Sequence, residues 1–149
     1  MTKTITGDNV PRTTTFGYDL AGKQNHIGYP DGFQLYYAYY PGTGLLHTAN
    51  GGDMVQYAAL SDYKAWGKPG KMSHGNLTRT EYDYDPESMR LAGITTYDPS
   101  DLPANYIQER LYTYTPAGDV ETLSDVKDSN TIFYYSYDGL HISVSDLDY

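Results

Sequence analysis

Four histidines are the first side chains in this sequence whose chemistry could matter: His26, His47, His74 and His141. His26 lies eight residues after Tyr18 and His47 lies eight residues after Tyr39, so a repeating fold could place the two side by side. A zinc site needs further ligands at a fixed spacing, and the sequence supplies no third one. We therefore predict no metal and no cofactor, and we interpret the histidines as packed or exposed polar side chains.

Carboxylates are the second group that could do chemistry. Glu81, Asp83 and Asp85 are close in sequence, but a glycosidase needs one pair at a set separation, and nothing singles out a pair here. The acidic stretch 125–130 lacks the ligand spacing of a calcium loop. No nucleophile elbow or phosphate-binding loop is present. The sequence thus predicts a protein that is not an enzyme.

Composition and charge exclude several classes of partner. The chain has 149 residues and a formal net charge of -9, so we expect no nucleic-acid partner. No apolar run approaches the roughly 20 residues of a membrane span, and no signal peptide is visible at the start. The chain contains 18 tyrosines, three phenylalanines and no cysteine. Tyrosine would therefore supply much of any buried surface, and sheets accept tyrosine well.

A short motif recurs along the chain: an aromatic residue, any residue, then a tyrosine, followed by a turn. The aromatic members are Phe16, Tyr18, Tyr37, Tyr39, Tyr82, Tyr84, Tyr112, Tyr114, Tyr135 and Tyr137. A weaker copy ends at Tyr63. We call the second aromatic of each copy its anchor; the anchors at 18, 39, 63, 84, 114 and 137 are 21, 24, 21, 30 and 23 residues apart. Such regular steps indicate a repeat array.

Spacing by two is the period of a strand, and the residues after each pair favour turns. Turn residues that we single out are Asp31, Gly32, Gly42 and Gly118. Each unit has room for about two strands, so we predict an all-β meander of roughly ten to twelve antiparallel strands. We expect an N-terminal extension over 1–12, about six repeats over 13–141 and a tail over 142–149. The long step predicts an insertion near 98–111, with a short helix beginning near Pro103.

The alternating side chains predict two unlike faces. Tyr82 and Tyr84 would share one face, and Asp83 and Asp85 the other. We expect the rings of stacked units to pack side by side, so that the role of the aromatic residues is stacking and not chemistry. An ordinary β-sandwich rich in tyrosine is the alternative fold.

At these residues the sequence resembles the RHS, or YD-repeat, family. The Tyr-Asp dipeptide that names the family occurs as Tyr18-Asp19, Tyr84-Asp85 and Tyr137-Asp138. Segments 17–46 and 82–95 follow the longer pattern closely, and the resemblance covers nearly all of 13–141. Tyr40, Lys64 and Thr115 depart from it, because they stand where the aspartate would be.

The resemblance implies a strip of β-hairpins that forms part of a hollow, spiral shell enclosing a toxin polypeptide, as in bacterial Tc and RHS toxins. Related repeats occur in teneurins, which are adhesion proteins. The implied partners are other shell segments, or copies of this chain at open sheet edges, and a toxin polypeptide. The implied location is secreted or on the cell surface. The alternatives are a module that binds carbohydrate or a surface, and a strip that assembles with itself into a filament.

Overall fold

A computed structural model describes residues 2–7, 10–101, 106–127, 131–138 and 141–147, and it gives only the backbone for 6–7, 10, 131, 136–138 and 141–147. These residues form thirteen strands: β1 (Thr2–Gly7), β2 (Val10–Tyr18), β3 (Gln24–Gly28), β4 (Gln34–Tyr39), β5 (Leu46–Gly51), β6 (Gln56–Ser61), β7 (Lys71–His74), β8 (Arg79–Tyr84), β9 (Leu91–Tyr97), β10 (Tyr106–Tyr114), β11 (Val120–Asp125), β12 (Thr131–Asp138) and β13 (His141–Leu147).

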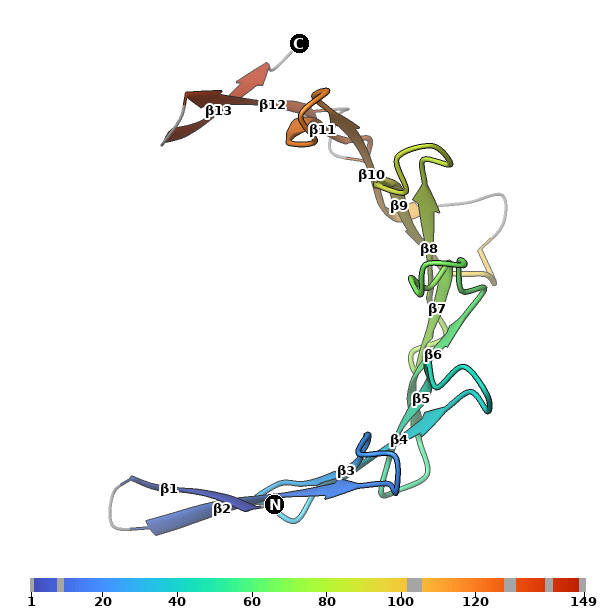
Figure 1. Ribbon diagram of the computed structural model, residues 1–149, viewed down its shortest axis with the longest axis vertical. Coiled ribbons are helices and arrows are strands. Elements are labelled where there is room, and N and C mark those ends of the chain that lie inside the picture. Colours follow the sequence, from blue (N-terminus) through green and yellow to red (C-terminus); the bar gives the residue numbers. More distant parts are fainter. Residues whose placement is uncertain (1, 8–9, 102–105, 128–130, 139–140, 148–149) are drawn as a thin grey trace.

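The strands form one sheet whose order is the order of the chain, and each strand pairs antiparallel with the next. The sheet is a single layer that curves into an open arc, with β1 and β2 at one end and β13 at the other (Figure 1). The predicted all-β hairpin strip is therefore confirmed. The described part holds thirteen strands, one more than our upper expectation, because residues 2–7 and 141–147 also pair as strands. Hairpin pairing thus extends into the expected extension and tail.

The helix expected near Pro103 does not extend beyond residue 105. Residues 102–105 lie outside the described part, and the chain from Tyr106 onward is strand β10. β10 pairs with β9 from Tyr106–Tyr97 to Leu111–Gly93. Tertiary pairing overrides the weak helix signal of a proline that could start a helix. Much of the 30-residue step is therefore longer hairpin arms: β9 has seven residues and β10 has nine.

Two rows of turns lie along the two edges of the strip. One row follows β2, β4, β6, β8 and β10, and comes directly after the anchor tyrosines. The other row follows β3, β5, β7 and β9, and in its tight turns an Asx side chain accepts the backbone N–H two residues on, as Asp31 does from Phe33. Gly32, Gly42 and Gly118 have φ of 88°, 84° and 102°, the left-handed conformation that favours glycine.

One face of the sheet carries an apolar belt, although no hydrophobic side chain among the described residues is buried. Directly paired residues share a face, so the register assigns the belt. It comprises Phe16, Ile27, Leu35, Leu60, Met72, Tyr82, Ile94, Tyr112, Leu123 and Phe133. We call this side the apolar face. No helix in the described part of the chain has the length and apolar character that a membrane crossing needs.

Candidate functional site

The anchor tyrosines tie each repeat unit to the unit before it. Tyr39 donates its hydroxyl to the Gln24 carbonyl at 2.6 Å, and Tyr63 donates to the Leu46 carbonyl at 2.6 Å. Tyr84 donates to the Pro69 carbonyl at 3.0 Å, and Tyr114 to the Leu91 carbonyl at 2.8 Å. Each acceptor lies just after the turn of the preceding unit. Sequence alone predicted the rings at these positions but not the use of their hydroxyl groups.

A side chain from the preceding turn contacts each of these four rings. Lys23 lies over the Tyr39 ring, with Nζ 5.3 Å from its centroid, and Arg90 lies over the Tyr114 ring at 5.5 Å. The other two steps use rings in the same way. They pair Tyr40 with Tyr63 and Trp66 with Tyr84, with centroids 6.0 and 5.9 Å apart and the planes nearly perpendicular. We call the hydroxyl bond and this ring contact together the tyrosine latch.

Close approach of Arg90 at the latch also explains why a glycine occupies position 118. Arg90 crosses the turn of the following unit, where a Cβ on Gly118 would overlap the guanidinium group. The φ of 102° at Gly118 disfavours a side chain for a second reason. The Arg90 guanidinium therefore lies between a glycine and the Tyr114 ring, in the arrangement of a cation–π contact.

The residue after each anchor forms the turn of its own unit. Asp19 accepts the N–H groups of Ala21 and Lys23, and Asp85 accepts those of Glu87 and Ser88. The hydrogen bonds from Ser88, then the weaker one from Glu87, hold the pKa of Asp85 below its usual value. The aspartate of the repeat motif thus closes the turn.

Where the aspartate is replaced, backbone bonds keep the turn. Tyr40 N–H donates to the Leu45 carbonyl, and Lys64 N–H donates to the Lys68 carbonyl. Thr115 donates its backbone N–H to the Asp119 carbonyl, and its hydroxyl oxygen accepts the Asp119 N–H at 3.3 Å. The three departures from the motif therefore retain the turn without the carboxylate.

A register shift recurs opposite the anchors. Tyr18 pairs with Gln24 although Gly17 pairs with His26, which leaves Asn25 as an extra residue on β3. Equivalent shifts occur at Tyr39, Tyr84 and Tyr114. Such β-bulges bend a strand and re-aim side chains, and they bring the latch residues together at this edge. No spacing rule that we applied to the sequence could reveal them.

Burial affects the acidity of four of the tyrosines. Desolvation is the largest cause that raises the pKa of the phenol groups of Tyr37, Tyr63, Tyr84 and Tyr114 above the ordinary value of about 10. The neutral, hydrogen-bonding form is thus favoured in the folded strip.

The predicted aromatic pairs lie on β2, β4, β8, β10 and β12. Tyr18 is 48% exposed, whereas Tyr37, Tyr39, Tyr82 and Tyr84 are half-buried. Tyr112, Tyr114 and Tyr135 are also half-buried, and the side chain of Tyr137 lies outside the described part. Phe16 is half-buried on the apolar face. Direct stacking of these rings on one another remains a prediction.

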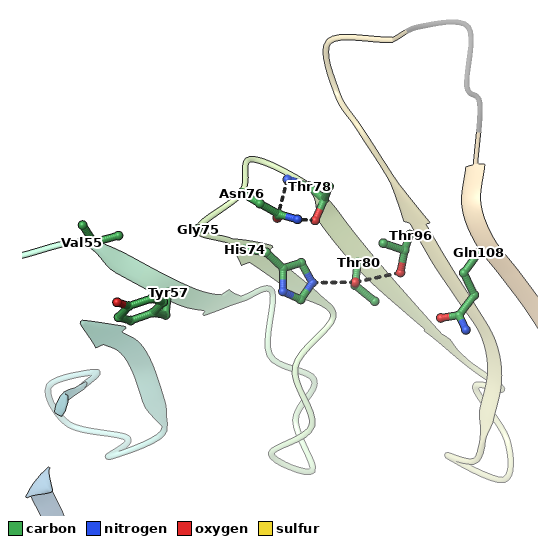
Figure 2. Close-up of a pocket in the computed structure, with 9 residues that line it drawn as sticks. All are labelled: Val55, Tyr57, His74, Gly75, Asn76, Thr78, Thr80, Thr96 and Gln108. Atoms are coloured by element: carbon green, nitrogen blue, oxygen red, sulfur yellow. Dashed lines mark hydrogen bonds between the residues drawn. The ribbon is translucent and has the colours of Figure 1, made fainter. Parts of the chain in front are cut away.

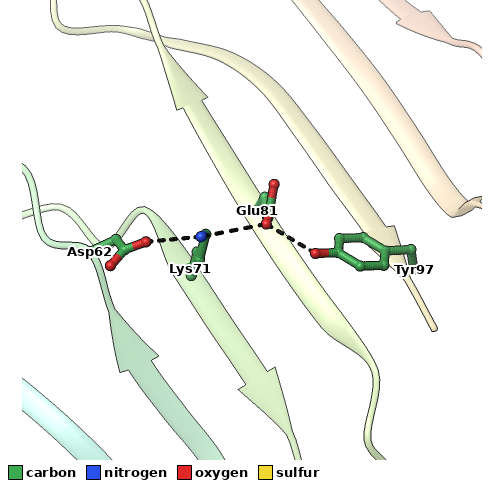
Figure 3. Close-up of polar contacts among 4 residues, drawn as sticks. All are labelled: Asp62, Lys71, Glu81 and Tyr97. Atoms are coloured by element: carbon green, nitrogen blue, oxygen red, sulfur yellow. Dashed lines mark hydrogen bonds and ion pairs between the residues drawn. The ribbon is translucent and has the colours of Figure 1, made fainter. Parts of the chain in front are cut away.

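The opposite face carries a row of polar contacts across three strands and the residue that follows β6. Lys71 Nζ lies 3.1 Å from Asp62 Oδ2 and 3.8 Å from Glu81 Oε1, and the Tyr97 hydroxyl donates to Glu81 Oε1 at 3.0 Å (Figure 3). The hydrogen bond to Asp62 is the main cause that raises the pKa of the Lys71 ammonium group. Glu81 is therefore engaged in a surface network rather than paired with a second carboxylate for catalysis.

The histidines contact different partners. His26 bonds to Gln34 and packs against the Tyr36 ring, while His47 packs against the Tyr40 ring with centroids 4.3 Å apart. His74 contacts Thr80, and the side chain of His141 lies outside the described part. Among the described residues, no three His, Asp or Glu side chains gather closely enough to hold a metal ion. The stretch 125–130 is described only as far as residue 127.

Known toxin proteins share this sequence pattern and this curved strip. Over 60 residues, 39% of this chain, the sequence is 40% identical to toxin subunit YenC1 of Yersinia entomophaga. The crystal structure of TcdB2-TccC3-Cdc42 matches 89% of the chain with a TM-score of 0.74 and 27% identity. The chain thus resembles the RHS, or YD-repeat, family of Tc toxins in both sequence and fold. A Tc holotoxin pore of Photorhabdus luminescens also matches, over 87% of the chain, with a TM-score of 0.72 and 27% identity.

The strip corresponds to a small part of those proteins. It covers 6% of the YenC1 subunit, 7% of the TcdB2-TccC3-Cdc42 chain and 6% of the holotoxin chain. No protein-family model matches the sequence. The similarity supports a structural role in a toxin complex.

Proposed function

We propose that this chain is a segment of the wall of a YD-repeat shell that encloses a toxin polypeptide, and that it has no catalysis of its own. One observation carries the proposal: the strip is curved and leaves its apolar belt uncovered. Its accessible surface is 10299 Å². A compact monomer of 16.7 kDa would expose about 7,600 Å².

The proposed partners follow from this geometry. Further strands can pair with the open edges at β1 and β13, and an unfolded toxin polypeptide can cover the apolar face. Family resemblance supports a location outside the producing cell or at its surface. The four tyrosine latches would hold consecutive hairpins at a fixed angle, as a wall of set curvature requires.

Binding of an unfolded polypeptide tests the role of the apolar face. The chain is titrated into a fluorescently labelled, permanently unfolded polypeptide, and anisotropy is measured. Ile94 lies on the apolar face and its neighbour Thr95 on the other, as their partners Tyr82 and Glu81 show. We expect Ile94→Lys to abolish most of the rise in anisotropy and Thr95→Lys to leave it unchanged.

Circular dichroism of both variants checks that the sheet is retained. Absence of binding by the unchanged chain, or an equal loss in the two lysine variants, would contradict a toxin-holding apolar face. A strip that binds no polypeptide and still forms large assemblies would favour the filament alternative instead.

A further inference from the structure

An open groove of about 740 Å³ lies on the apolar face beside the turns after β5 and β7. Its lining comprises Val55, Tyr57, His74, Gly75, Asn76, Thr78, Thr80, Thr96 and Gln108. These residues come from segments that are neighbours in the sheet, and their side chains border one hollow (Figure 2). None of the nine carries a formal charge, although the chain as a whole has a net charge of -9.

One side of the groove is a fixed row of hydrogen bonds. His74 Nε2 and Thr80 Oγ1 are 2.8 Å apart, and Thr80 Oγ1 and Thr96 Oγ1 are 2.9 Å apart (Figure 2). Thr80 is only 6% exposed, so the middle of this row is buried. Asn76 Oδ1 accepts hydrogen bonds from the Thr78 N–H and hydroxyl group. The side-chain nitrogen of Asn76 is then the group that can donate to a ligand.

The rim of the groove offers an aromatic ring and an amide. Tyr57 is 43% exposed, and its ring meets Phe33 edge-on with centroids 6.0 Å apart. Gln108 lies at the other end, on β10, which is three strands beyond His74 on β7 and two strands beyond Thr80 on β8. From β6 to β10 the groove spans four strand spacings, about 19 Å.

We propose that this groove binds a neutral oligosaccharide lying across the strands. A sugar presents an apolar ring face, which an exposed tyrosine can cover, and hydroxyl groups, which amide, imidazole and threonine groups can bind. An uncharged lining fits a neutral ligand. A peptide adding as a strand is disfavoured here, because the groove lies on the sheet face, where the backbone groups already pair with neighbouring strands.

The test is saturation-transfer NMR on the intact chain with three probes: the β-1,4-linked tetramer of glucose, the β-1,4-linked tetramer of N-acetylglucosamine and the α-1,4-linked tetramer of glucose. We expect at least one to receive saturation. Tyr57→Ala should weaken binding about tenfold, corresponding to about 1.4 kcal/mol. Gln108→Ala, which alters only an amide on the rim, should weaken binding several-fold.

The matched control is Tyr36→Ala, because Tyr36 is 46% exposed and lies on the opposite face, paired with His26. It should leave sugar binding unchanged. Saturation of none of the three tetramers, or an equal effect of Tyr36→Ala and Tyr57→Ala, would overturn the proposal.

Discussion

Each latch tyrosine in this strip makes two contacts with one side chain, a ring contact and a hydroxyl hydrogen bond. The Tyr84 ring packs against Trp66 while its hydroxyl donates to the Pro69 carbonyl. Phenylalanine could supply the first contact but not the second. Tyrosine therefore outnumbers phenylalanine 18 to 3 in a sheet with no buried hydrophobic side chain among its described residues. The hydroxyl group links units that have no shared core.

Substitution at Tyr84 separates the two contributions. We expect Tyr84→Phe to lower the free energy of unfolding by about 1 kcal/mol, the usual net value of one hydrogen bond. Tyr84→Ala should lower it by about 3 kcal/mol, because the ring contact is lost as well. Urea denaturation measures both. Tyr36→Phe, at an exposed position, should change stability by no more than a few tenths of a kcal/mol; a loss equal to that of Tyr84→Phe would contradict the latch.

Alkaline pH should weaken the strip. The pKa values of Tyr37, Tyr63, Tyr84 and Tyr114 are raised by burial in the folded state. Their contribution to stability is therefore complete below about pH 10 and is lost as the pH rises through the folded-state values, because the unfolded chain releases its protons first. The free energy of unfolding, measured in urea from pH 8 to pH 11, should fall above pH 10. Tyr84→Phe should make that fall shallower, and an unchanged slope would exclude Tyr84 as a contributor.

At the scale of the element, each hairpin depends on its turns and on the latch to its neighbour. Two exposed non-glycine residues, Met54 and Leu77, adopt left-handed φ values of 63° and 71° in the turns after β5 and β7. Gly32 takes the corresponding place in the turn after β3. The repeat thus keeps one turn geometry even where the residue does not favour it.

Glycine at these positions should stabilise the strip. A left-handed conformation costs an ordinary residue about 1–2 kcal/mol, and glycine avoids this strain. Glycine also loses more conformational entropy on folding, which offsets part of the stabilisation. We expect Met54→Gly and Leu77→Gly each to raise the free energy of unfolding by about 0.5–1 kcal/mol. Thermal unfolding measures the change. Leu20→Gly, also at an exposed turn position but without a left-handed φ, should not be stabilising.

The latch between the fourth and fifth units can be measured as a coupling. Arg90 lies over the Tyr114 ring across the unit boundary. A double-mutant cycle of Arg90→Ala and Tyr114→Ala should show a coupling energy of about 0.5–1 kcal/mol, the range of an exposed cation–π contact. Additive effects, within the error of the urea denaturation, would mean that the two side chains stabilise their units independently.

The strands could be predicted from the sequence because the aromatic pairs are spaced by two residues, which is the period of a strand. Sequence reasoning missed what depends on contacts between units. The bulge opposite Tyr39 and the bond from Tyr39 to the Gln24 carbonyl involve residues in different units, and no local pattern marks the acceptor. The helix expected near Pro103 does not continue past residue 105, for the related reason that pairing with β9 makes Tyr106–Tyr114 a strand.

At the scale of the whole molecule, the strip is a surface without an interior. It exposes roughly a third more area than a compact chain of its mass. Its strands contact only their neighbours in sequence, so its stability is a sum of local and nearest-neighbour contributions. Both the apolar face and the edges therefore favour association, while the net charge of -9 opposes it.

Self-association should thus depend on salt. We expect light scattering during size exclusion to give a mass above that of the 16.7 kDa monomer, and the mass should rise with ionic strength as like charges are screened. Ile94→Lys should lower the mass at every salt concentration, whereas Thr95→Lys, on the other face, should lower it less. A monomer at all salt concentrations would show that the face and both edges are protected within the chain.

The coincidence of strand order with chain order has a consequence for synthesis. A strand emerging from the ribosome can pair with the strand that precedes it, so the strip can form one hairpin at a time. No step has to wait for a distant segment, and contacts close in sequence favour rapid folding. The strand synthesised last has an unpaired edge with which the next strand can pair. The arc therefore grows in the direction of translation.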